Sequence, residues 1–295
     1  MEKFQITLGR NRVTPRTERS SCSYLVPRLV TRQRLKDLVS LARAKGRRAH
    51  GLFLVEGVRS VASALAAQAP LDVVLIARDA GLGDLAARAD ATGVPVEHVA
   101  ARDLQKVGDA RTSQGAVAVA RSVVADALPD GAAPVVLLDG VQDPGNVGTI
   151  LRTAAWFGAR AVVTDDATAD VESPKVVRAS MGGLWDVALI RVPSLVPVLD
   201  QLAASRADVW AADLGGAPVH EWEPAERAAL VLGSEAHGVS APVRDWLRAN
   251  RPAGSRFVFV PGAERGAERG AERARGVESL NVSVAAGVLL ARWLG

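Results

Sequence analysis

The second half of the chain is constrained most strongly by a strict alternation of apolar, strand-like segments and helical segments. Strands are predicted at residues 135–139, 160–164, 187–191, 207–212, 229–233 and 256–260. Helices are predicted between and after them, at residues 147–157, 174–181, 195–204, 242–249 and 279–293. This alternation predicts an α/β fold in which helices cover both faces of a mostly parallel sheet.

Parallel sheets of this type bind ligands at the carboxyl ends of their strands. Three polar segments follow or include such strand ends, at residues 139–152, 233–238 and 260–281. We therefore expect these segments to meet on one rim of the sheet, although they lie far apart in the sequence.

The first half alternates in the same way and predicts a smaller α/β domain over residues 25–125. Its predicted strands are 52–57, 71–77, 94–99 and 115–120, and its predicted helices are 32–44, 58–68, 84–91 and 101–107. Residues 1–24 are expected to form a flexible basic tail. Residues 126–134, "DALPDGAAP", have the composition of a linker to the second domain, 135–295.

The charge distribution points to a nucleic-acid partner without proving one. The chain has 36 Lys and Arg against 32 Asp and Glu, and its basic residues are dense between Arg10 and Arg48. Such a basic region is typical of nucleic-acid binding. A solvated helix face that follows a disordered tail is an equally open interpretation.

Other classes of protein are disfavoured by composition. No apolar run approaches the roughly 20 residues of a membrane-spanning helix, and the N-terminus lacks the apolar segment of a secretory signal. A single cysteine, Cys22, favours a reducing cytoplasm. The four histidines are scattered, so no metal-ligand cluster is expected.

The segment "DGVQDPGNVGTILRTAAWFGA" resembles a nucleotide-binding turn, but its glycines fit neither the dinucleotide fingerprint nor the P-loop. Asn146 is expected at the N-cap of the following helix, a position that asparagine often takes for structural reasons. Arg152 is expected on an apolar helix face, half-buried, where its charge needs an anionic partner. That partner is either a structural carboxylate or a bound phosphate.

Two later segments also carry candidate residues. In "LVLGSEAHGVS", Gly233 lets the backbone approach a ligand, and Glu235 is either a functional group or the cap of a helix near Val239. In "ESLNVSVAAGVLLARWLG", Ser279 and Asn281 open an amphipathic helix that is equally consistent with an interface element.

Together, in this order, these three segments resemble the three motifs of the SpoU (TrmH-like) RNA ribose 2′-O-methyltransferases of the SPOUT superfamily. The resemblance spans residues 135–295, and "PKVVRASMGG" fits the stretch between the first two motifs. In the first half, "FLVEGVRSVASAL" and "QGAVAVA" resemble the small substrate-binding domain of the ribosomal-RNA branch.

The resemblance implies a C-terminal trefoil knot that forms the pocket for S-adenosylmethionine, and a homodimer through the C-terminal domain. It implies cofactor contacts by Gly233, Val260 and Leu280. It also implies polar positions around the reaction centre at Asn146, Arg152, Glu235, Ser279 and Asn281, with Arg152 as the central catalytic group.

Elementary chemistry limits these roles. Methyl transfer to a ribose hydroxyl needs alignment and a route for the proton rather than a metal ion. A guanidinium group holds its proton strongly, so Arg152 is a more conservative choice as a clamp for the adjacent RNA phosphate than as a base. Asn146 and Glu235 are expected to orient the reacting groups.

One departure from the family pattern concerns the third motif. Gly262 stands where the family usually has methionine, and the repeat "GAERGAERGAER" lengthens the link before "SLN". The repeat could loop out, loosen cofactor binding or cover the site, and the first of these is favoured.

Three competing functions remain open at this point. A dinucleotide-dependent oxidoreductase is disfavoured by the missing glycine fingerprint. A non-catalytic RNA-binding relative is disfavoured by the full set of polar motif residues. A tRNA ribose 2′-O-methyltransferase is disfavoured by the basic first domain, which favours ribosomal RNA as the partner.

Overall fold

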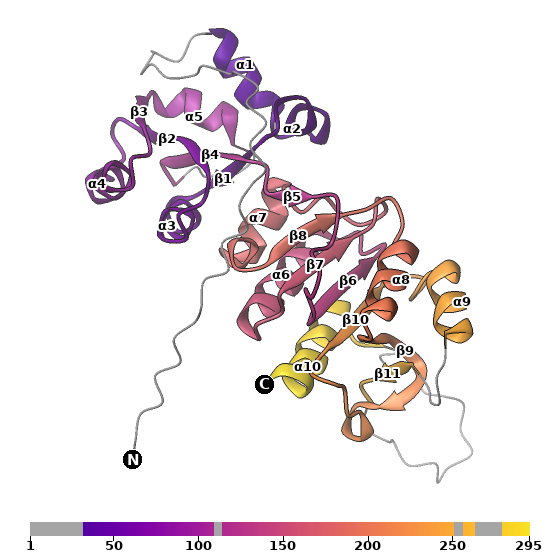
Figure 1. Ribbon diagram of the computed structural model, residues 1–295. Helices are drawn as coiled ribbons and strands as arrows, with labels where there is room; N and C mark the ends of the chain where they lie inside the picture. Colours follow the sequence, from indigo (N-terminus) through magenta and orange to yellow (C-terminus); the bar gives the residue numbers. More distant parts are fainter. Residues whose placement is uncertain (1–31, 109–113, 251–255, 263–278) are drawn as a thin grey trace, which may run out of the picture.

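The computed structural model describes residues 32–108, 114–250, 256–262 and 279–295 (Figure 1). They form a four-stranded sheet of order β1-β4-β2-β3 and a seven-stranded sheet of order β11-β9-β10-β6-β7-β8-β5. The predicted α/β architecture is confirmed. The expected tail at residues 1–24 and the repeat from residue 263 onward lie outside the described residues.

The small sheet is mixed. It consists of β1 (Leu52–Glu56), β2 (Leu71–Ala77), β3 (Val96–Val99) and β4 (Ala116–Arg121). Strand β4 runs antiparallel to β1 and β2, and β2 runs parallel to β3. Alternate residues point to opposite faces of a strand, so the sheet has helices on both sides. Phe53 packs in the same core as α3 (Val58–Ala66) and α4 (Gly83–Ala91). Leu54, on the other face, packs with α1 (Arg32–Ser40) and α5 (Ala101–Val107).

The prediction of one helix over residues 32–44 is wrong, because the chain breaks after α1 and restarts as α2 (Ala44–His50). Helix α2 folds back so closely that a Cβ on Gly46 would lie 2.1 Å from the Ser40 carbonyl oxygen. The Arg47 guanidinium donates to the carbonyl oxygens of Leu41 and Ala42, at 2.9 and 3.1 Å. These bonds satisfy backbone groups that a continuous helix would have paired.

The large sheet is parallel throughout, as the alternation of elements predicted. Its strands are β5 (Val124–Ala125), β6 (Val135–Asp139), β7 (Ala161–Thr164), β8 (Ala188–Arg191), β9 (Asp208–Pro218), β10 (Ala228–Gly233) and β11 (Phe257–Phe259). Strand β9 is longer than predicted because β11 pairs with its far end, at Ala217 and Pro218. Gly216 permits this pairing, since a Cβ there would lie 2.3 Å from the Phe257 backbone.

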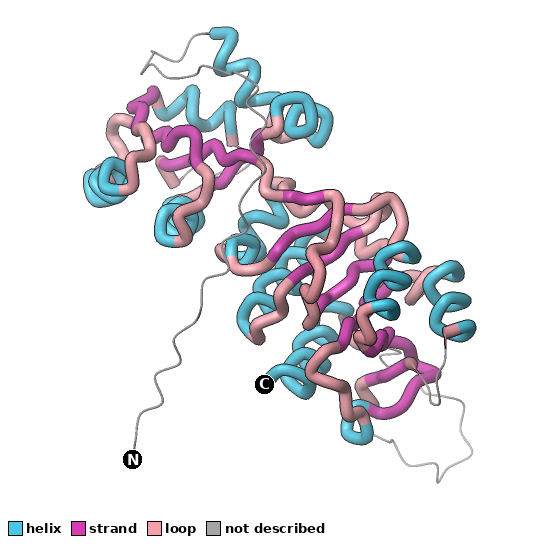
Figure 2. The backbone as a smooth tube through the Cα atoms, in the orientation of Figure 1, coloured by secondary structure: helices cyan, strands magenta, loops and turns pink. Residues whose placement is uncertain are grey.

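Helices cover both faces of the large sheet (Figure 2). The buried side chains of α6 (Pro144–Trp156), α7 (Pro174–Ser180) and α10 (Val282–Leu294) share one core with Val136 and Leu138. Those of α8 (Val196–Ala204) and α9 (Ala241–Ala249) share the other core with Leu137. Short 3₁₀ turns at Gly183–Trp185 and Val219–Glu221 complete the described elements.

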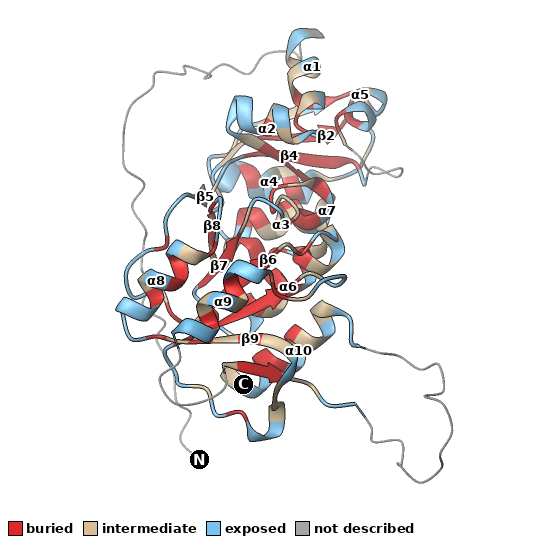
Figure 3. Cartoon of the chain, turned by 90° about the vertical axis from the view of Figure 1, so that its right-hand side faces the viewer, coloured by how far each residue is buried: buried red, intermediate tan, exposed pale blue. Residues whose placement is uncertain are grey.

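The two sheets belong to units that pack against each other, and buried positions run through the strands of both (Figure 3). The rings of Phe53 and Trp185 stack with centroids 5.8 Å apart. Arg178 of α7 forms an ion pair with the buried Glu56 at the end of β1. Apolar packing and an ion pair with a buried carboxylate therefore hold the small unit against the α7 side of the large one.

Two features are absent from the described residues. No helix among them combines the length and the apolar character that crossing a membrane requires. No group of three or more His, Cys, Asp or Glu within the described ranges has the arrangement of a metal site.

Candidate functional site

Helix α6 starts at the carboxyl end of β6, where the chain turns sharply. Gly140 adopts a left-handed conformation, with φ of 70°, and its N–H donates to Asp165 and to Thr168, both at 3.1 Å. The prediction of Asn146 as the N-cap of this helix is wrong. Asp143 is the cap, and its carboxylate accepts from the Asn146 N–H at 2.8 Å. Because Asp143 caps the helix, the Asn146 side chain is available for other contacts.

The Asn146 side chain joins three segments that are distant in sequence. Its Nδ2 donates to a carboxylate oxygen of Glu235, 89 positions away. Its Oδ1 accepts a bond of 3.0 Å from Nδ2 of Asn281, 135 positions away. We call these three residues the amide network. The predicted meeting of the three polar segments at one rim of the sheet is therefore confirmed.

Glu235 reaches the amide network from a tight turn after β10. Ser234 and Gly238 exchange backbone hydrogen bonds across this turn, at 3.0 and 2.8 Å. A Cβ on Gly233 would lie 2.3 Å from the Gly238 backbone, so only glycine lets the turn close onto the strand end. The alternative in which Glu235 caps the following helix is wrong, because α9 begins at Ala241, beyond this turn.

The turn after β10 is fixed to β6 by a buried carboxylate. The N–H of Ser240 donates to Asp139 at 2.6 Å, and Asp139 is the last residue of β6. Burial raises the pKa of Asp139, while the Ser240 bond opposes that shift. This contact therefore keeps two strand ends of the site in register.

Asn281 serves both as a member of the amide network and as the N-cap of α10. Its Oδ1 accepts from the backbone N–H of Ser283 at 2.9 Å and of Val284 at 3.4 Å. The helix therefore begins at Val282, later than the predicted residue 279, and Ser279 lies exposed before it. Among the described residues, no hydrogen bond joins Ser279 to the amide network.

Arg152 differs from its prediction. It is exposed rather than half-buried, because α6 turns Val147, Ile150, Leu151 and Ala154 into the core and leaves Arg152 on the opposite side. It forms no ion pair or hydrogen bond with any residue in the described ranges. A structural carboxylate partner is therefore not found there, and the guanidinium is open to an external anion.

The predicted cofactor residues lie around the same edge. Gly233 ends β10, Val260 directly follows β11, and Leu280 directly precedes Asn281. Val260 is half-buried against the core, whereas the side chain of Leu280 is 46% exposed. A backbone-lined turn with adjacent apolar side chains suits a flat, mostly apolar group such as an adenosine.

The sequence reasoning missed the loop at residues 165–172, "DDATADVE". It follows β7, and it holds Gly140 through Asp165 and Thr168. The available signal was an acidic run directly after a predicted strand, at the edge where ligands are expected.

Comparisons with known proteins agree with this geometry. Residues 133–250 match the SpoU rRNA Methylase family, and residues 32–118 match the MRM3-like substrate binding domain. The chain is 31% identical over 266 residues to the 23S rRNA (guanosine(2553)-2′-O)-methyltransferase RlmP of Bacillus subtilis, covering 88% of this chain and 94% of the relative.

Solved structures show the same likeness. A TrmH-family RNA methyltransferase described as putative, from Porphyromonas gingivalis, is 32% identical with a TM-score of 0.73, over 90% of this chain and 98% of that one. The SpoU methyltransferase AviRb of Streptomyces viridochromogenes, solved with AdoMet, is 27% identical with a TM-score of 0.75, over 90% of this chain and 97% of that one.

Proposed function

This chain belongs to the SpoU family of rRNA methylases, and from that premise we propose that it transfers a methyl group from S-adenosylmethionine to a ribose 2′-hydroxyl of ribosomal RNA. The observation that carries the proposal is the amide network, which unites all three family motifs in one place. A tRNA substrate and a non-catalytic role remain the alternatives that experiment must separate.

The residues present fit S-adenosylmethionine, which is the cofactor in the solved relative AviRb. When bound, it supplies a methyl group made electrophilic by a sulfonium charge. The chain offers a glycine-tightened turn at Gly233, apolar side chains at Val260 and Leu280, and an exposed carboxylate at Glu235. A nearby carboxylate favours a cation, and the apolar positions suit the adenosine.

Asn146 is proposed to orient the ribose. Its amide is held on both sides, since Glu235 accepts from Nδ2 and Asn281 donates to Oδ1. One Nδ2 hydrogen is left to donate to a sugar oxygen. Preorganised donors of this type align a hydroxyl without further rearrangement during reaction. Glu235 is proposed to hold Asn146 in this orientation.

Arg152 is proposed to clamp the RNA phosphate next to the reacting ribose. It lies six residues, about 9 Å along the helix axis, from Asn146. Its guanidinium is exposed and without an ion pair in the described part of the chain. A planar guanidinium binds phosphate with two parallel hydrogen bonds. These bonds hold the phosphate in one orientation and so restrict the position of the attached ribose. Ser279, exposed beside Asn281, is proposed to complete the polar rim.

We assign RNA capture to residues 25–125 and methyl transfer to residues 135–295. The match of residues 32–118 to a substrate binding domain supports the first assignment, and that of residues 133–250 supports the second. A ribosomal RNA substrate would place the protein in the cytoplasm.

The C-terminal segment is proposed to thread a trefoil knot. Strand β11 lies at the far edge of the sheet, beyond β9, whereas α10 packs back against α6 and bonds it through Asn281 and Asn146. The described chain therefore leaves the sheet at its outer strand β11 and is found again at α10, against the central helix α6. A crystal structure in which that segment passes outside the 234–240 turn would refute the knot.

A homodimer through the C-terminal domain is proposed on the basis of exposed apolar side chains on α10 and α6. Val284 and Val288 lie on the outer side of α10, and Trp156 of α6 is 84% exposed. Large exposed apolar groups commonly mark interfaces. Light scattering should give twice the 30.9 kDa chain mass, and V284E should give the monomer mass. A monomeric wild-type protein would refute the dimer.

The function itself is tested by giving the purified protein methyl-labelled S-adenosylmethionine and ribosomal RNA from a strain that lacks the gene. We expect labelling of one or more ribose 2′-oxygens, mapped by their resistance to alkaline cleavage. Labelling of tRNA alone would support the alternative substrate. Cofactor binding without transfer to any RNA would support the non-catalytic alternative.

A further inference from the structure

A polar groove lies between the small unit and the large sheet, away from the amide network. Two adjoining hollows of about 510 and 460 Å³ share Val124, Asp166 and Arg191 and together form it. We call it the inter-domain groove. Arg47 and Arg48 of α2 line one side, and the ends of β5, β7 and β8 line the other. Its volume is within the range of small-molecule sites.

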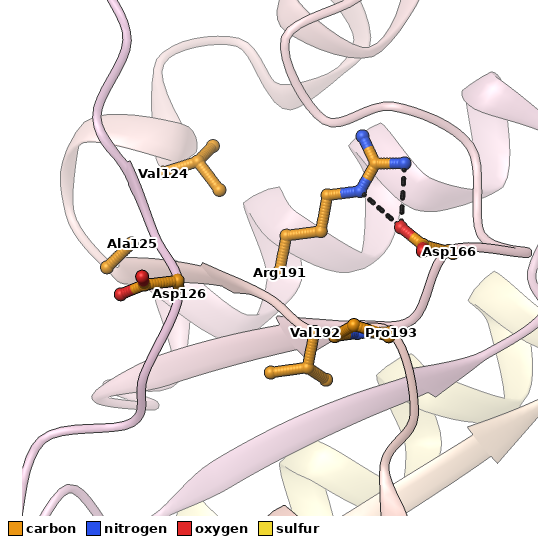
Figure 4. Close-up of a pocket in the computed structure, with 7 residues that line it drawn as sticks. All are labelled: Val124, Ala125, Asp126, Asp166, Arg191, Val192 and Pro193. Atoms are coloured by element: carbon orange, nitrogen blue, oxygen red, sulfur yellow. Dashed lines mark hydrogen bonds and ion pairs between the residues drawn. The ribbon is translucent and has the colours of Figure 1, made fainter.

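The groove presents a donor and an acceptor next to each other over an apolar surface. Arg191 donates to Asp166 through Nε and Nη2, both at 2.9 Å (Figure 4). Both side chains remain accessible, at 28% exposure for Arg191 and 60% for Asp166. Asp126 lies across the groove, and the apolar lining comes from Val124, Val192 and Pro193. Because both members are accessible, this pair can exchange partners with a ligand.

These groups match the edge and the face of an RNA base. The apolar side chains can pack on the flat face, while carboxylate and guanidinium groups read the edge. Guanine and cytosine each carry both an exocyclic amino group, which a carboxylate accepts, and a carbonyl group, which an arginine donates to. Adenine lacks the carbonyl and uracil lacks the amino group. Asp126 and Asp166 also disfavour a phosphate on this side of the groove.

The groove lies on the same edge of the sheet as the amide network. Strands β8 and β6 are separated only by β7, so their ends are about 10 Å apart. The loop at residues 165–172 borders both places. Asp166 lines the groove, while Asp165 and Thr168 hold Gly140 in the turn between β6 and α6. An occupant of the groove is therefore close enough to belong to the strand that carries the reacting ribose.

We propose that the inter-domain groove binds a single-stranded guanine or cytosine that neighbours the target nucleotide, read by Asp166 and Arg191. This inference rests on the proposed function, because the bound base is part of the same RNA substrate. The groove then decides which RNA sequence is methylated, while the amide network carries out the transfer. Arg48, which has no ion pair among the described residues, can hold the phosphate of the same nucleotide.

The test uses an RNA fragment that contains the nucleotide methylated by the wild-type protein, with each neighbouring unpaired base replaced in turn. For the wild type, replacing the base bound in the groove by uracil should lower kcat/KM about tenfold. D166N removes the negative charge and replaces one of the two acceptor oxygens by a donor, so it should reduce this discrimination to within about twofold. The same substitution at Asp245, which lies on α9, is the matched control and should keep the wild-type discrimination.

The outcomes separate the two proposals. If the wild type methylates RNA and D166N retains full discrimination, the groove proposal is overturned. It is also overturned if D166N weakens all sequences equally, since that result indicates a backbone contact. Unchanged S-adenosylmethionine binding and melting temperature in D166N, together with lost discrimination, support it. If the wild type neither binds the cofactor nor methylates any RNA, the proposed function fails first.

Discussion

At the carboxyl edge of the large sheet, β6 and β10 end near two amides and one carboxylate, whereas β7 and β8 end among ion pairs. The amide network is half-buried or exposed, and its members come from within the large unit. In the groove, Arg47 of the small unit is 4% exposed and bonds Asp170 of the large one at 2.6 Å. The two places lie on one edge but are built from different chemistry.

This difference indicates that some residues on this edge of the sheet contribute mainly to activity and others mainly to stability. Exposed hydrogen bonds contribute little to stability, because water replaces them when they are lost. A buried ion pair is costly to break, because removing one partner leaves the other charge without compensation. Substitutions at the amide network should therefore change turnover, and substitutions at the Arg47–Asp170 pair should change folding.

The largest expected effect is on activity and comes from R152A. Loss of the proposed phosphate clamp should reduce kcat/KM for RNA by at least about a thousandfold, or ~4 kcal/mol of transition-state stabilisation. The melting temperature should hardly change, since Arg152 is exposed and forms no ion pair with the described residues. Single-turnover methylation and thermal unfolding measure the two quantities. Near-normal turnover in a folded variant would remove Arg152 from the mechanism.

The next effect is on stability and comes from R47A. It should lower the free energy of unfolding by about 3 kcal/mol, because Asp170 loses its ion-pair partner and two carbonyl groups lose a donor. R48A is the matched control on the same helix and should change stability by no more than about 0.5 kcal/mol. Urea unfolding measures both. Equal losses in the two variants would contradict the assigned role of the buried pair.

N146A should have a somewhat smaller effect, again on activity. Removing the oriented amide should lower kcat about a hundredfold, equivalent to ~2.7 kcal/mol. The stability change should stay below about 1 kcal/mol. T153A, on the same helix, is the control and should retain wild-type turnover. If N146A is destabilised but turns over normally when folded, the amide network contributes to stability rather than to activity, and the contrast with the Arg47–Asp170 pair fails.

The smallest effect concerns pH and the buried Glu172. Burial raises the pKa of Glu172, more than its bonds from Ser122 and Val123 lower it. The folded state therefore favours the protonated acid, so wild-type stability should fall, relative to E172Q, as pH rises from the ordinary glutamate pKa of 4.5 through the raised pKa. Urea unfolding of the wild type and E172Q between pH 4 and pH 7.5 measures this difference. A difference that is independent of pH would contradict the shift.

Local sequence signals were sufficient for most elements of the fold. Apolar periodicity located the strands, and the predicted bounds of β2, β6 and α5 match the structure fully. The errors have specific physical causes. Arg47 turns back to cap Leu41 and Ala42, which splits the first helix. Asp143 takes the cap position that was predicted for Asn146, because α6 starts one turn earlier.

Only part of the candidate site could be predicted from the sequence. Motif order and the parallel sheet predicted that Asn146, Glu235 and Asn281 would meet, because strand ends on one edge must converge. Burial of Arg152 was predicted wrongly, since apolar neighbours in sequence do not fix which way a helix faces its core. The groove could not be predicted, because Arg47 and Asp170 are 123 residues apart and no local pattern links them.

The amide network also bears on when during synthesis the protein becomes competent. Glu235 and Asn281 emerge from the ribosome 89 and 135 residues after Asn146. A nascent chain that stops before Asn281 can already build the small sheet and much of the large one, yet it holds only an incomplete centre. The protein can therefore become active in methyl transfer only when α10 docks. An amino-terminal fragment that ends before Asn281 should have no activity even when it folds.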